Sequence, residues 1–140
     1  MILFLDTSAL VKLYVEEVHS AAVRERVDGA EIVAACRVAY PEAVSALNRR
    51  MRAGDLSKGA YGIASRALRR DWDRLAVVDF REVEAGRLAA KYGLRGFDAI
   101  HLSSAVILAS APAGPDLLFS SFDAALNRAA VGERLQVLAS

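Results

Sequence analysis

Short apolar runs alternate with longer stretches of helical periodicity along this chain. The runs have the length and composition of buried strands and occupy residues 1–5, 32–35, 75–78, 117–120 and 135–138. Between them, apolar residues recur every three or four positions, which predicts helices over residues 17–28, 40–51, 57–73, 80–91 and 98–109. This alternation is typical of an α/β domain in three layers, with helices on both faces of a central, mostly parallel sheet.

Polar residues and helix breakers mark several boundaries of these elements. Thr7 and Ser8 follow the first strand and are predicted to cap a short helix. Pro112, Gly114 and Pro115 predict a turn before the strand at residues 117–120. A short helix is expected to start at Asp123.

Length and composition narrow the class of protein. We expect one domain over residues 1–140, with 54% hydrophobic residues available for a core. Cys36 is the single cysteine and has no partner for an intramolecular disulfide, which favours a reducing compartment. No basic leader precedes the apolar start, and no run approaches the roughly 20 apolar residues of a membrane span. We therefore expect a cytoplasmic protein without membrane association.

Charge gives little guidance on its own. The net charge of +1 does not indicate a nucleic-acid-binding protein. Arginines gather at residues 49–52 and 66–74, and such runs are usually solvated helix faces. They gain meaning only beside a site that handles phosphate.

Two acidic residues lie where strands of the predicted sheet end. Asp6 directly follows the first strand, and Asp123 comes just after the strand at residues 117–120. Ligands of open α/β sheets bind beyond the carboxyl ends of the strands. Both acids are therefore candidates for a functional site.

Two further acids start apolar helices. Asp98 precedes an almost wholly apolar segment and is expected to be partly buried, which is costly for a carboxylate without a positive partner. Glu42 shares one helix face with Ser45, Arg49 and Arg52, away from the apolar stripe. A metal could bind at the carboxylate while the arginines reach for phosphate.

Each acid also has an ordinary structural explanation. Asp6, Asp98 and Asp123 could be helix caps, and Glu42 could be a first-turn acid that interacts with the helix dipole. From the pattern alone, capping and a shared site remain open.

Four segments resemble the motifs of PIN-domain ribonucleases, in particular toxins of the VapC type. They are Leu5-Asp6-Thr7-Ser8-Ala9-Leu10, Pro41-Glu42-Ala43-Val44-Ser45-Ala46-Leu47, Gly96-Phe97-Asp98-Ala99-Ile100-His101-Leu102 and Ser120-Ser121-Phe122-Asp123. The segments occur in the family's order and span nearly the whole chain. The fourth is the least specific, because Ser121 stands where threonine is frequent.

The resemblance implies a PIN-like fold and a metal-dependent endoribonuclease, the toxin of a type II toxin–antitoxin pair. Asp6, Glu42, Asp98 and Asp123 would form the catalytic acidic cluster, supported by the hydroxyls of Thr7 or Ser121. Clustered carboxylates repel one another unless a cation joins them, and an all-oxygen ligand set favours Mg²⁺ or Mn²⁺ over zinc. Arg49 and Arg52 would contact the RNA substrate.

The same resemblance implies a small antitoxin as protein partner and a homodimer of the chain. His101 lies inside the third motif, one turn after Asp98, and we interpret it as a packed core residue. Two rival functions are considered. A phosphotransferase with Asp6 as nucleophile would want a second aspartate where Ser8 stands, and a catalytically silent RNA- or protein-binding module would not need the complete acid set.

Overall fold

The computed structural model describes residues 1–112 and 116–138. Its strands form one sheet in the order β3-β2-β1-β4-β5, and every adjacent pair is parallel. The strands are β1 (Ile2–Leu5), β2 (Ile32–Cys36), β3 (Ala76–Val78), β4 (Leu117–Ser120) and β5 (Gln136–Val137). The predicted α/β class with a parallel sheet is confirmed.

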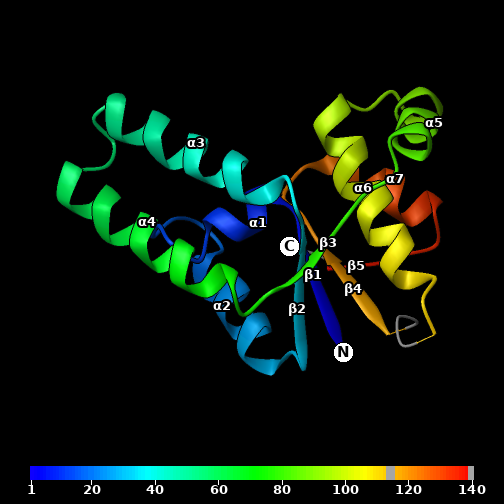
Figure 1. Ribbon diagram of the computed structural model, residues 1–140, viewed down its shortest axis with the longest axis horizontal. Helices are drawn as coiled ribbons and strands as arrows, with labels where there is room; N and C mark the ends of the chain where they lie inside the picture. The colour runs from blue at the N-terminus through cyan, green and yellow to red at the C-terminus, as the bar shows by residue number, and fades with distance from the viewer. Residues whose placement is uncertain (113–115, 139–140) are drawn as a thin grey trace.

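Helices cover both faces of the sheet, which gives the three predicted layers (Figure 1). The described helices are α1 (Thr7–Val11), α2 (Ser20–Gly29), α3 (Ala39–Arg52), α4 (Lys58–Trp72), α5 (Glu82–Tyr92), α6 (Gly96–Ala109) and α7 (Ala124–Gly132). Within the described residues, no helix has both the length and the apolar character needed to cross a membrane.

Strand β1 shows how the sequence divides the core between the two faces. Ile2 and Phe4 belong to a buried cluster with residues of α5, α6 and α7. Leu3 and Leu5 belong to a second cluster with residues of α1, α2, α3 and α4. Successive side chains of a strand point to opposite faces, so a continuous apolar run is what a strand covered on both sides requires.

The ends of some elements differ from the prediction. Asp6, and not Thr7 or Ser8, caps α1, because its carboxylate accepts the Ala9 N–H at 3.0 Å. Helix α2 begins at Ser20, three residues later than predicted, because the Ser20 hydroxyl accepts the Glu17 N–H and holds the preceding residues in a loop. The predicted turn includes Gly114 and Pro115, and residues 113–115 lie outside the described residues.

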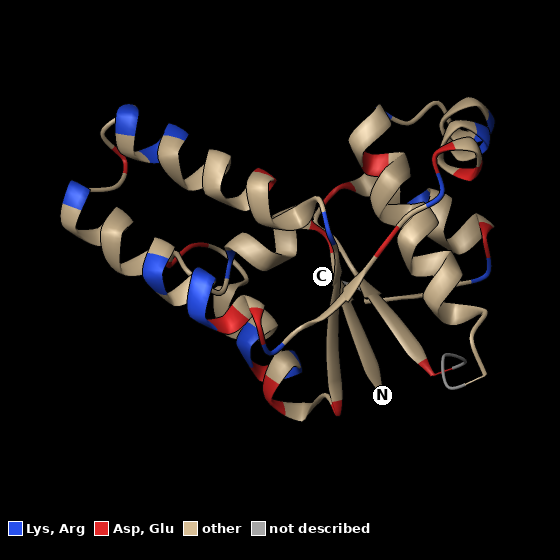
Figure 2. Cartoon of the chain, viewed as in Figure 1, with Lys and Arg blue, Asp and Glu red and all other residues tan. Residues whose placement is uncertain are grey.

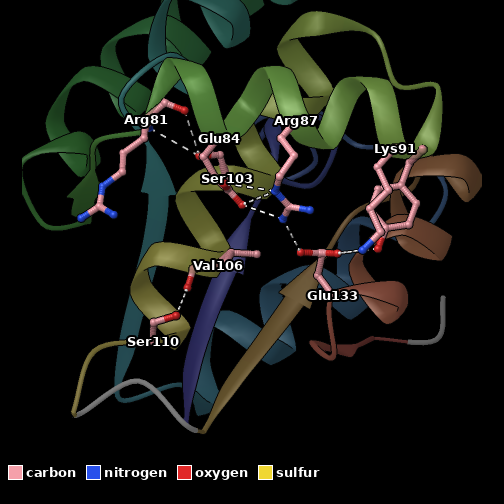
Figure 3. Close-up of polar contacts among 9 residues, drawn as sticks. Arg81, Glu84, Arg87, Lys91, Ser103, Val106, Ser110 and Glu133 are labelled. Carbon is pink, nitrogen blue, oxygen red and sulfur yellow. Dashed lines mark hydrogen bonds and ion pairs between the residues drawn. The ribbon is translucent and has the colours of Figure 1, made fainter.

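A group of ion pairs joins α5 to the end of α7. Glu133 accepts hydrogen bonds from Arg87 and Lys91, both on α5, and from the Tyr92 hydroxyl (Figure 3). A Cβ atom at Gly132 would lie only 2.6 Å from the Tyr92 hydroxyl oxygen, so a larger residue there would have to displace the Tyr92 side chain. The group connects α5 to the end of α7 on the sheet face that α6 also covers.

Candidate active site

All four predicted acids line one pocket of about 440 Å³ at the carboxyl ends of the strands. Asp6 follows β1 and Asp123 follows β4, and these two strands are direct neighbours in the sheet. Glu42 comes from the first turn of α3 and Asp98 from the first turn of α6. The other lining residues are Thr7, Ser8, Val11, Lys12, Glu17, Ala46, Arg49, Arg50, Arg95 and His101.

Asp6 is the most deeply placed of the four acids, with 3% of its surface exposed. Its Oδ1 atom accepts the Ser8 hydroxyl at 2.7 Å as well as the Ala9 N–H. Burial raises the pKa of Asp6, and hydrogen bonds from Ser121, Ser8 and Ala9 oppose that rise only in part. Asp6 therefore both caps α1 and lines the pocket.

Glu42 is held by two side chains from other helices. Its Oε1 atom accepts the Thr7 hydroxyl at 2.7 Å and lies 2.6 Å from His101 Nε2. Burial by itself would raise the pKa of Glu42, but the hydrogen bonds from His101 and Thr7 outweigh it and hold the pKa below its usual value. Both bonds use Oε1, which leaves Oε2 available for a ligand.

His101 is buried, as predicted, but it does more than pack. An ionised carboxylate only accepts, so Nε2 of His101 must carry the hydrogen that lies between it and Glu42. His101 Nδ1 is buried and has no hydrogen-bond partner among the described residues. The interpretation of His101 as a core residue was therefore incomplete. Its place three residues after Asp98, on the same helix face, was the signal that could have shown this.

Asp98 and Asp123 share a cation. Arg95 donates from Nε to Asp98 at 3.2 Å and from Nη2 to Asp123 at 3.5 Å. Asp123 also caps α7 through the Leu126 N–H, whereas Asp98 lies inside α6 and is not its cap. Arg95 precedes α6, and the sequence interpretation missed it.

Two serines tie the loop after β4 to the rest of the site. The Ser8 hydroxyl donates to Asp6 and accepts the Phe122 N–H at 3.0 Å. The Ser121 hydroxyl, buried at 3% exposure, accepts the Asp123 N–H at 3.0 Å. The loop that carries Asp123 is therefore fixed relative to β1.

The two predicted substrate arginines fall in different places. Arg49 lines the pocket and donates to Ser45 at 2.8 Å. Arg52 is exposed and does not line the pocket. Three other basic residues, Lys12, Arg50 and Arg95, do line it. Figure 2 shows the basic positions toward the outer end of α3. The run of arginines indicated a basic helix end, but it did not reveal which of them face the acids.

A family comparison gives the site its context. A match to the PIN domain family spans residues 3–132. Ribonuclease VapC45 and Ribonuclease VapC49, from two strains of Mycobacterium tuberculosis, are each 33% identical to this chain over 132 residues. Those alignments cover 92% of this chain and 89% of each relative. The chain belongs to the PIN domain family.

Solved structures agree with the PIN fold. PAE2754 from Pyrobaculum aerophilum matches with a TM-score of 0.69 at 23% identity, over 98% of this chain and 89% of that one. VapBC-1 from nontypeable Haemophilus influenzae matches with a TM-score of 0.64 at 16% identity, over 99% and 97%. The resemblance to PIN domains seen in the four motifs is confirmed.

The donor atoms of this PIN pocket suit a hard cation. The four predicted acids, Glu17 and the hydroxyls of Thr7 and Ser8 give it mainly oxygen donors, with one imidazole and no thiol among the lining residues, a set that Mg²⁺ and Mn²⁺ prefer. As the side chains stand, no three acidic, histidine or cysteine residues of the described chain are close enough together to hold a metal ion. Arg95 lies against Asp98 and Asp123, so a cation held by these two acids would compete with the guanidinium.

Proposed function

We propose that this chain is an Mg²⁺- or Mn²⁺-dependent endoribonuclease that hydrolyses RNA phosphodiester bonds. One observation carries the proposal: four carboxylates from β1, α3, α6 and the loop after β4 line a single pocket in a chain that is 33% identical to proteins named ribonucleases. Asp6, Glu42, Asp98 and Asp123 would hold the metal. A bound divalent cation supplies Lewis-acid activation of water and stabilises charge on the phosphodiester.

The chain's own residues prepare the pocket for this work. Thr7 and His101 orient the Glu42 carboxylate, and Ser8 and Ser121 fix the segments that carry Asp6 and Asp123. Hydrogen bonds of this kind around ligand carboxylates set their orientation and basicity. Arg49, at the pocket wall, would contact the RNA backbone. Arg52 does not line the pocket, which makes it a poorer candidate than Arg50.

The relatives' names also support a protein partner. The chain resembles VapC proteins in sequence and the structure named VapBC-1 in fold, so we infer a small antitoxin that binds this chain and blocks the pocket. A homodimer stays a prediction of the resemblance, and light scattering on the purified chain would check it.

The test is cleavage of single-stranded RNA with Mg²⁺ or Mn²⁺, with EDTA as the metal-free arm. Asp98→Asn removes one charge with little change of shape, and Asp28→Asn, at an exposed position of α2, is the matched control. We expect cleavage by the wild type and by Asp28→Asn only with metal, and a loss of at least about a hundredfold in Asp98→Asn. Equal cleavage by Asp98→Asn would overturn the assignment and favour a silent binding module.

A further inference from the structure

A three-residue bridge lies on the wall of the pocket, apart from the four acids. Glu17 accepts from Lys12 Nζ through Oε1 at 3.0 Å and pairs with Arg50 Nη2 through Oε2 at 2.6 Å. All three residues line the same pocket as the carboxylates. One carboxylate thus holds two cations from different elements, Lys12 after α1 and Arg50 on α3.

The bridge is built into the fold on each side. The Glu17 backbone is fixed by Ser20, whose wholly buried hydroxyl accepts the Glu17 N–H and donates to the Val15 carbonyl at 2.9 Å. The Lys12 ammonium lies 4.6 Å from the ring centre of Phe122, next to Asp123, and its side chain is only 12% exposed. These contacts hold the cations in place before any ligand binds.

The bridge keeps a net positive charge and unused donors. Two cations against one acid leave +1, and Arg49 adds a further charge on the same wall. An ammonium has three N–H donors and a guanidinium has five, so the pairing with Glu17 leaves most of them free. A phosphate could therefore bind Lys12 and Arg50 while both stay paired with Glu17.

A purely stabilising role explains these features less well. An exposed ion pair is worth about 0–1 kcal/mol, and a partly buried pair must first repay the loss of hydration. The pairs Arg69–Asp73 and Arg37–Asp79 are ordinary surface pairs of the exposed kind. The Glu17 bridge instead places its cations on the wall of the pocket that the four acids line.

We propose that Lys12 and Arg50 bind a backbone phosphate of the RNA beside the one that is cut, and that Glu17 is the positioning residue that holds them. The inference rests on the proposed function, because it names the substrate contacts of that same pocket. The four acids repel an anionic strand, and Arg95 is already paired with Asp98 and Asp123. A strand therefore needs further cationic contacts beside the acids, and the bridge supplies two of them.

The test measures binding of a short, labelled single-stranded RNA of mixed sequence in EDTA, at several salt concentrations. Arg50→Gln is compared with Arg52→Gln, two residues along the same helix but outside the pocket. We expect Arg50→Gln to weaken binding about tenfold and to reduce the slope of log K against log salt by about 0.7. Equal effects of the two substitutions would overturn the inference. Lys12→Met should behave as Arg50→Gln does, and Lys12→Arg should retain most of the affinity.

Glu17→Gln separates positioning from simple charge. If Glu17 only neutralised the two cations, its removal would tighten RNA binding and steepen the salt dependence. As a positioning residue, it should instead weaken binding and make the slope shallower, because the amide NH2 group replaces one of the two carboxylate oxygens and cannot accept from the cation that faces it. Tighter or unchanged binding would contradict the role.

Cleavage with Mg²⁺ keeps the two proposals distinguishable. Wild-type cleavage that is lost in Asp98→Asn, together with equal binding by Arg50→Gln and Arg52→Gln, would refute the phosphate site alone. A wild type that neither binds nor cuts RNA would refute the proposed function as well. Thermal melts of each variant show whether it is folded.

Discussion

The carboxylate of Glu42 and the imidazole of His101 meet at 2.6 Å across 59 residues of sequence. The contact joins α3, on one face of the sheet, to α6, on the other. A buried histidine that holds the Glu42 carboxylate links the two halves of the pocket. The geometry of Glu42 therefore depends on a residue that would not itself touch a metal.

Replacing His101 should disturb metal binding rather than folding alone. His101→Phe keeps a ring in the buried position but removes the donor to Glu42. We expect the affinity for Mn²⁺ to fall about tenfold, as is usual for the loss of such a supporting hydrogen bond. Calorimetry would measure it. Ser103→Ala on the same helix, whose hydroxyl faces Arg81 and not the pocket, should bind Mn²⁺ like the wild type (Figure 3).

Arg95 should compete with the cation for Asp98 and Asp123. Arg95→Ala is expected to raise the Mn²⁺ affinity by up to about fivefold, because an exposed ion pair contributes no more than ~1 kcal/mol. Arg81→Ala, also just before a helix but remote from the four acids, is the control. A lower affinity in Arg95→Ala would show that the arginine supports the metal site and does not oppose it.

Much of this site follows from the sequence, and the reasons are physical. Parallel strands end at one edge of a sheet, so the positions of Asp6 and Asp123 after two strands already bring them together. The contact between Glu42 and His101 depends on how two helices lie across the sheet, which periodicity does not reveal.

Arg50 and Arg52 illustrate the same limit. They lie about 80° to either side of Glu42 around the helix, so the roll of α3 decides which of them turns toward the pocket. The prediction placed Arg52 on the Glu42 face, but the structure places Arg50 in the pocket. The sequence could not decide between helix capping and a shared site, because Asp6 and Asp123 do both: each caps a helix and lines the pocket.

Ser8 should matter for stability through its two hydrogen bonds. Ser8→Ala leaves the Asp6 carboxylate with one donor fewer and the Phe122 N–H without its acceptor. We expect a loss of about 1–3 kcal/mol in the free energy of unfolding, measured with urea. Ser110→Ala removes an exposed hydroxyl that bonds only within its own helix end and should cost much less. A Ser8→Ala variant as stable as Ser110→Ala would refute the link.

The ion pairs of Glu133 should make the free energy of unfolding depend on pH in the acidic range. The Tyr92 hydroxyl, with Lys91 and Arg87, lowers the pKa of Glu133 to about 2 against the opposing effect of burial. A carboxyl whose folded pKa is lowered stabilises the protein above its unfolded pKa, and this stability is lost as the pH falls toward the folded pKa.

Glu133→Gln should therefore cost about 1–2 kcal/mol at neutral pH and progressively less below about pH 5. Urea unfolding at several pH values measures the difference between the variant and the wild type. Glu82→Gln, at an exposed position of α5, provides the control. A difference that stays constant down to pH 3 would show that the charge of Glu133 does not stabilise the fold.

The central claim is that Asp6, Glu42, Asp98 and Asp123 form one metal site. The most direct measurement is a calorimetric titration of Mn²⁺ into the wild type and into Asp98→Asn, because it needs no knowledge of the RNA target. We predict saturable binding by the wild type and an affinity at least about tenfold lower in Asp98→Asn. Equal binding by both proteins, or no binding by the wild type, would contradict the account.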